Sequence, residues 1–134
     1  VAKALRKEPK WFLRDWSGVV DDGARAETLV ACHLLKAVEG WTDLGFGDFE
    51  LRYVRDKSKR EVDFLVVRDR RPWFLVEVKL SDTGLSPALG HFQAQTGAAH
   101  AFQAVTSLPY EPADCFTATQ PVVVPTRTLL AQLL

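Results

Sequence analysis

The sequence predicts an α/β fold in which a mixed central sheet of four or five strands is flanked by helices. Two observations support this prediction. Apolar runs of strand length, rich in Val, Leu and Phe, occupy the middle of the chain, and segments of helical period lie before and after them. A chain of 134 residues, of which 47% are hydrophobic, is long enough to form one domain with a sizeable core.

The first helix is predicted over residues 24–39. Asp21 suits the N-cap position, acidic residues favour the positive end of the helix dipole, and apolar residues recur at helical spacing through Val38. Gly40 is expected to end this helix, because glycine is common just past the last helical turn. Upstream, the aromatic run Trp11-Phe12-Leu13 is expected to form a short strand or a packing hook.

Three strands are predicted next. Residues 49–55 alternate between apolar and polar, as in a half-buried strand, whereas residues 61–67 and 73–80 are almost continuously apolar, as in central strands covered on both faces. Ser86-Pro87 is a typical helix start. The remaining predicted elements are a helix over 87–96, a strand over 101–106, a short strand over 122–124 and a helix over 126–134.

Four charged residues lie within the two central strands. Glu77 and Lys79 are two residues apart and share a face of one strand, as Glu61 and Asp63 do on the other. A tight hairpin would bring Asp63, Glu77 and Lys79 together on an otherwise apolar sheet. Buried charges are costly unless they pair or hold a metal, so this set predicts a functional site. Glu61 is interpreted as an ordinary charge at the strand end.

This set resembles the PD-(D/E)XK nuclease superfamily, with Asp63 as the first acid and Glu77 and Lys79 as the E-x-K element. A closer resemblance is to the uncharacterised C-terminal domain that follows AAA+ ATPase modules in bacteria and archaea. The matching motifs are Gly23 to Glu27, Arg55 to Glu61-Val62-Asp63-Phe64, and Glu77-Val78-Lys79. The resemblance runs from about residue 10 to 106. It implies a restriction-endonuclease-like αβββαβ core over about residues 23–106.

A pair of carboxylates on strands favours a hard divalent cation such as Mg²⁺ or Mn²⁺, which binds oxygen ligands. Asp63 and Glu77 would supply these carboxylates, and the resemblance adds the backbone carbonyl of Val78 as a third ligand. Lys79 is expected to orient or deprotonate the attacking water, or to stabilise the phosphate. Glu27 on the first helix is a candidate ligand for a metal-bound water or a second metal.

One further polar residue is an accessory candidate. Gln93, on the helix after the third strand, resembles a polar residue that some superfamily members place there. Gln95 is an equally good candidate by position. No His, Cys or Ser pattern for another metal site or a serine hydrolase is present in the sequence.

These observations predict a metal-dependent nuclease that hydrolyses DNA, with an ATPase module in cis. The chain begins with Val and lacks Met and a phosphate-binding P-loop, so it is expected to be a fragment whose ATPase part lies outside it. Cleavage of both strands would require two sites and therefore a homodimer. The alternatives are a non-catalytic module of the same fold that binds nucleic acid or protein and regulates the ATPase, or hydrolysis of a smaller phosphate ester.

Composition constrains the partners. The net charge is zero, which provides no global electrostatic argument for nucleic acid, although residues 52–79 contain nine Lys or Arg against five Asp or Glu. The cations at the turns are interpreted as solvated, and Arg52 and Arg55 as partners of nearby acids, with phosphate contact as the alternative. The two cysteines, Cys32 and Cys115, are interpreted as reduced thiols, which favours a cytoplasmic protein. The sequence has no apolar run long enough to predict a membrane span.

Overall fold

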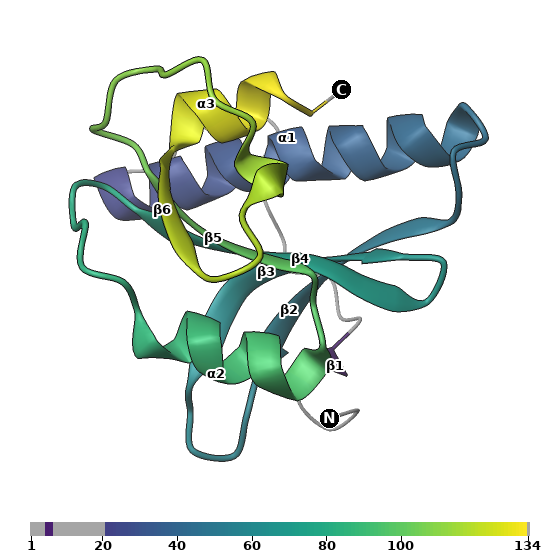
Figure 1. The fold of residues 1–134 in the computed structure, drawn as a ribbon, viewed down its shortest axis with the longest axis horizontal. Coiled ribbons are helices and arrows are strands. Elements are labelled where there is room, and N and C mark those ends of the chain that lie inside the picture. Colours follow the sequence, from purple (N-terminus) through teal and green to yellow (C-terminus); the bar gives the residue numbers. More distant parts are fainter. Residues whose placement is uncertain (1–4, 7–20, 134) are drawn as a thin grey trace.

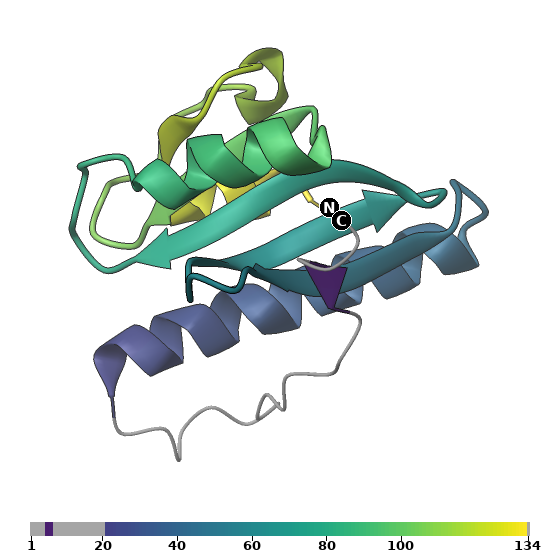
Figure 2. The same ribbon diagram turned by 90° about the horizontal axis from the view of Figure 1, so that it is seen from below.

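The computed structural model describes residues 5–6 and 21–133, which form a mixed α/β domain. Two helices, α1 and α3, cover one face of a six-stranded sheet, and α2 covers the other (Figures 1 and 2). The elements run β1 (Leu5–Arg6), α1 (Asp22–Asp43), β2 (Phe49–Arg55), β3 (Glu61–Arg68), β4 (Arg71–Lys79), α2 (Pro87–Thr96), β5 (His100–Val105), η3 (Cys115–Thr117), β6 (Val122–Pro125) and α3 (Thr126–Ala131).

The strands lie in the sheet in chain order. β2, β3 and β4 form an antiparallel meander, and β5 and β6 are added in parallel to β4. The α2 crossover makes the parallel β4–β5 pairing possible, because parallel neighbours need a long connection. The predicted α/β class, mixed sheet and αβββαβ order are confirmed. The sequence did not predict the edge strand β1, and the expected strand at residues 11–13 lies outside the described residues.

The central strands bury both of their faces. Phe64 and Val66 pack under α1 and α3, whereas Leu65 and Val67 pack under α2 with Phe92. This alternation explains why the sequence of β3 is almost continuously apolar, since a sheet covered by helices on both sides has no solvated face. Within the described residues, no helix is long and apolar enough to cross a membrane.

The first helix is longer than predicted. The Asp21 carboxylate accepts a hydrogen bond from the backbone N–H of Gly23, as expected of an N-cap, but the helix continues past Gly40 to Asp43. Trp41 lies in this extra turn and packs its ring against Trp73, with ring centroids 5.6 Å apart. Packing of the partly buried Trp41 ring against the core outweighs the roughly 1 kcal/mol that glycine costs inside a helix, so Gly40 does not end it.

The turn between β3 and β4 is shorter than predicted. Asp69 and Arg70 both adopt left-handed backbone conformations, with φ of 50° and 68°, and Arg68 pairs directly with Arg71. Two consecutive left-handed residues are the signature of a type I′ hairpin turn. The strand therefore begins at Arg71 and not at Trp73. Helix α3 ends at Ala131, earlier than the predicted residue 134.

Candidate functional site

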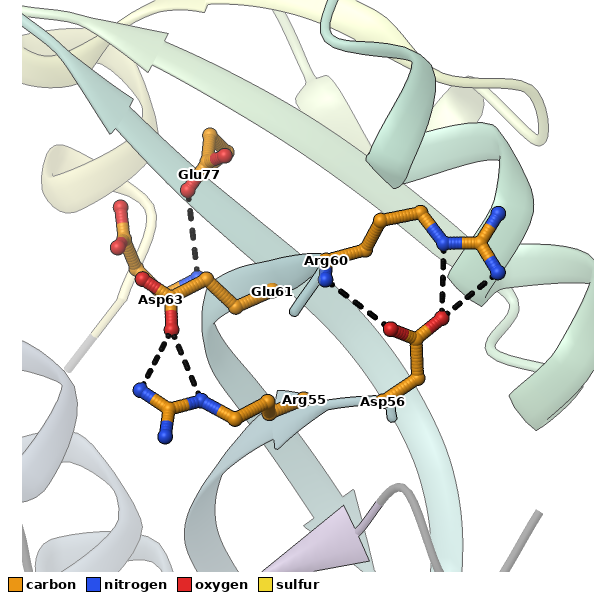
Figure 3. Close-up of polar contacts among 6 residues, drawn as sticks. All are labelled: Arg55, Asp56, Arg60, Glu61, Asp63 and Glu77. Atoms are coloured by element: carbon orange, nitrogen blue, oxygen red, sulfur yellow. Dashed lines mark hydrogen bonds and ion pairs between the residues drawn. The ribbon is translucent and has the colours of Figure 1, made fainter. Parts of the chain in front are cut away.

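Asp63 and Glu77 meet at the end of the β3–β4 hairpin. The backbone ladder between these strands runs as far as the Phe64–Val76 pair. Beyond that pair, side-chain carboxylates accept the hydrogen bonds from the backbone of the opposite strand. The Asp63 N–H donates to Glu77 Oε1 at 3.3 Å, and the Val78 N–H donates to Asp63 Oδ2 at 2.9 Å. Each side chain thus binds the backbone of the opposite strand, and the two carboxyl groups are held next to each other (Figure 3).

A β-bulge places Asp63 at this position. Along β2, Arg52 pairs with Leu65 and Val54 pairs with Val62, so β3 advances three residues where β2 advances two. Asp63 and Phe64 therefore stand opposite the single residue Tyr53. Bulges bend a strand and re-aim its side chains, and they are common beside functional sites. The alternation of faces is interrupted after Asp63, because Val62 and Leu65, three residues apart, pack in the same cluster under α2.

Glu77 is a buried carboxyl group. Only 8% of the residue is exposed, in a strand whose neighbouring residues are apolar. The pKa of Glu77 is raised to about 8, first by burial and then by the hydrogen bond and negative charge of Asp63, against the opposing effects of the Lys79 charge and the Asp63 N–H. Two adjacent carboxyl groups that resist joint ionisation are suited to share a proton or a cation.

Lys79 lies two residues beyond Glu77 on the same strand and is partly buried. Its charge favours the ionised form of Glu77, so its ammonium group acts electrostatically on the carboxyl pair. Its backbone carbonyl accepts a hydrogen bond from Thr106, which joins the ends of β4 and β5. Asp63 and Glu77 are thus in contact, and Lys79 is close enough for its charge to act on Glu77.

The other predicted site residues lie differently. Val78 contributes its backbone N–H to Asp63. Glu27 is partly buried in the first half of α1. Within the described part of the chain no three His, Cys, Asp or Glu side chains are grouped as metal ligands, and the assignment of Glu27 to the site stays a prediction. Gln93 uses its amide to donate to the carbonyls of Ala98 and Thr119, away from the pair.

Gln103 is a residue that sequence reasoning missed. It lies opposite Glu77 in the β4–β5 pairing and is fully buried. Its amide oxygen accepts from the Ser86 N–H at 2.8 Å, and its amide nitrogen donates to the carbonyls of Asp82 and Gly84 at 3.1 and 2.9 Å. One side chain thereby holds the loop that leads from Lys79 into α2. The only sequence signal was a lone polar residue inside an apolar strand.

Two arginines of β2 are paired with acids, as the sequence analysis favoured. Arg55 contacts Glu61 at 3.1 Å, and both side chains are about half exposed, so Glu61 is an ordinary charge at the strand end (Figure 3). Arg52 pairs with Glu50 on the same strand. Both cysteines are free thiols.

Comparison with known proteins identifies a family. No curated protein and no solved structure matches the chain significantly. One family model, described as Domain of unknown function (DUF4143), matches residues 22–121, a stretch that contains α1, the β2–β4 meander, α2, β5 and the carboxyl pair. Because this match covers most of the sequence, the chain belongs to the DUF4143 family.

Proposed function

We propose that this chain is a metal-dependent phosphodiester hydrolase domain that acts on DNA. The observation that carries the proposal is the contact between Asp63 and Glu77 at the ends of two buried strands, with Lys79 beside them. The element order α1, β2–β4, α2, β5 supports it, because it is the αβββαβ order that the resemblance to PD-(D/E)XK nucleases implies. The resemblance also implies an ATPase module in cis.

The carboxyl pair suits Mg²⁺ or Mn²⁺. These cations prefer oxygen ligands, and Mg²⁺ is commonly bound by one or two carboxylates together with waters and a substrate phosphate, so a third protein carboxylate is not required. Asp63 and Glu77 would hold the ion, and its binding would release the proton that Glu77 carries at neutral pH. A bound divalent ion lowers the pKa of a coordinated water and offsets charge on the phosphate.

The remaining residues of the site have roles that follow from their contacts. The Val78 N–H holds Asp63 in one orientation, so the carboxylate is preorganised for an ion or a water. Lys79 would orient the attacking water or stabilise the negative charge of the phosphate, since its ammonium group already acts on Glu77. Gln103 would keep the loop after Lys79 in place beside the scissile bond.

A second candidate function is a non-catalytic module that binds nucleic acid or protein and regulates the ATPase. The pKa of Glu77 favours it, because a value of about 8 leaves this carboxyl group protonated at neutral pH unless a cation displaces the proton. The zero net charge also favours it, since the whole chain does not attract DNA electrostatically.

A cleavage assay tests the proposal. The chain is incubated with single-stranded, duplex and branched DNA in Mn²⁺ or Mg²⁺, beside Lys79→Ala and the control Lys36→Ala, which removes an exposed lysine from α1. We expect cleavage by the wild type and the control and none by Lys79→Ala. Cleavage that survives in Lys79→Ala would indicate a contaminating nuclease and would remove the support for this site.

Calorimetry separates the two candidate functions. Binding of Mn²⁺ to the wild type, its loss in Glu77→Gln and its retention in the exposed-carboxylate control Glu39→Gln would support the hydrolase. If the wild type binds no metal at millimolar concentration and cleaves no DNA, the regulatory module is the better description.

A further inference from the structure

The turn between β2 and β3 concentrates positive charge. Residues 55–61 contain four cations and two carboxylates, a surplus of two positive charges, and the rest of this neutral chain carries the matching negative surplus. Lys57 and Lys59 are exposed, and their ammonium groups form no ion pair within the part of the chain that the structure describes. Their charge is thus available to a partner.

The turn that carries these lysines is held in one conformation. Its ends are joined by hydrogen bonds from the Asp56 N–H to the Arg60 carbonyl at 3.0 Å and from the Lys59 N–H to the Asp56 carbonyl at 3.1 Å. The Arg60 guanidinium donates to Asp56 Oδ2 through Nε at 2.8 Å and lies 2.7 Å from it through Nη2 (Figure 3). Lys59 has a left-handed backbone, with φ of 64°.

The turn is also tied to α2. His91 Nε2 lies 3.6 Å from Asp56 Oδ2, and His91 Nδ1 lies 3.5 Å from Arg60 Nη1. The Asp56 side chain is only 13% exposed, so its negative charge is covered by its partners, whereas the Arg60 side chain remains 49% exposed. The outer surface of the turn is therefore more positive than its composition indicates, and it is anchored at both its strand and helix sides.

The turn lies at the same end of the sheet as the carboxyl pair. Arg55 and Glu61 form the last β2–β3 pair, and Asp63 follows two residues later. Asp63 lies four positions after Lys59, so their Cα atoms are at most about 14 Å apart. Because successive nucleotides of one DNA strand advance about 3.4 Å along the helix axis, this reach corresponds to roughly four nucleotides.

We propose that Lys57 and Lys59 of the β2–β3 turn bind the phosphate backbone of duplex DNA within about four nucleotides of the Asp63–Glu77 pair. This inference rests on the proposed function, which it extends from the scissile bond to the flanking backbone. Lysine acts as a point charge toward phosphate and reads no base, so the contact contributes affinity and position without sequence preference. The rigid turn lowers the entropic cost of holding both charges in place.

A matched pair of double variants tests the proposed contact between the β2–β3 turn and DNA. Lys57→Gln with Lys59→Asn removes two charges from the turn, and Arg71→Gln with Arg70→Asn removes two from the opposite end of β3 and β4. Lys59 and Arg70 share a left-handed backbone, with φ of 64° and 68°, which Asn tolerates well. The two turns are separated by the eight-residue strand β3, about 23 Å long. This exceeds the Debye length of about 10 Å at 0.1 M salt.

Binding to a fluorescent duplex is measured by anisotropy between 50 and 200 mM KCl, with EDTA present so that no cleavage occurs. We expect the β2–β3 turn variant to lose affinity by on the order of tenfold and to flatten the slope of log K against log salt by about 2. The β3–β4 turn variant is expected to behave like the wild type. Thermal melts of both variants check that the fold is retained.

Three results would overturn the inference: equal losses in both variants, no loss in the β2–β3 turn variant, or no duplex binding by the wild type. The proposed hydrolysis is judged separately, from the Lys79→Ala cleavage assay. Cleavage without a contribution from the turn would refute this contact and retain the hydrolase. Binding through the turn without cleavage would retain this contact and refute the hydrolase.

Discussion

Replacement of Glu77 by Gln is predicted to change the pH dependence of stability. In the folded protein the pKa of Glu77 is about 8, compared with an ordinary value of 4.5, because the carboxyl group is buried and adjoins Asp63. Folding therefore favours the protonated form. Below about pH 4.5 the Glu77 carboxyl group is protonated in both the folded and the unfolded state, so its ionisation does not lower the free energy of unfolding. As the pH rises from 4.5 to 8, the unfolded chain releases the proton and the folded protein retains it, so stability falls and then levels off.

The magnitude follows from the same two values. At about 1.4 kcal/mol per pH unit, a rise from 4.5 to about 8 corresponds to a loss of roughly 5 kcal/mol of unfolding free energy between acidic and alkaline pH. Local rearrangement and entry of water reduce this loss, and we expect the unfolding free energy to fall by about 3 kcal/mol. Gln mimics the protonated carboxyl group, since it retains an oxygen that can accept the Asp63 N–H and gains an amide that can donate to Asp63.

Urea unfolding at pH 5, 6.5, 8 and 9, in EDTA, measures the effect. The difference in unfolding free energy between Glu77→Gln and the wild type is expected to grow in favour of the variant as the pH rises. Glu39→Gln, which alters an exposed carboxylate on α1, is the control and should show no such trend. A Glu77→Gln difference that stays constant from pH 5 to 9 would refute the reasoning, because it would mean that Glu77 ionises in the folded protein as it does in the unfolded chain.

Three further predictions concern stability. Gln103→Leu should cost about 3 kcal/mol, because it leaves one backbone N–H and two carbonyls of residues 82–86 without partners, and hydrogen exchange should show early loss of protection at Ser86; unchanged protection would argue against this role. Trp41→Ala should cost about 3 kcal/mol in chemical denaturation through lost contacts with Trp73, and a cost below about 1 kcal/mol would contradict the packing. Asp21→Ala should lower stability by about 1 kcal/mol, whereas Asp21→Ser should retain most of it if the cap is what matters.

Local sequence patterns predicted the elements because their causes are local. Near-continuous apolar runs indicate strands covered on both faces, and β3 and β4 are such strands. Asp21 identified the start of α1, and Ser86-Pro87 identified the start of α2. The spacing of Asp63, Glu77 and Lys79 indicated that a short hairpin would bring these charges together, and in the hairpin Asp63 and Glu77 are in contact.

The details of the site were decided by contacts between residues far apart in the chain. The bulge at Asp63 depends on the register of β3 against β2, and a register is a property of two strands, which neither strand's pattern specifies alone. The same holds for Gln103, whose partners lie about 20 residues upstream, and for Gln93, which bonds to the loop before β6 and not to the site. Gly40 lies inside α1 because Trp41 packs on Trp73, a residue of another element. The sequence by itself determined which charges belong to the central strands, and the tertiary structure decided which of them touch.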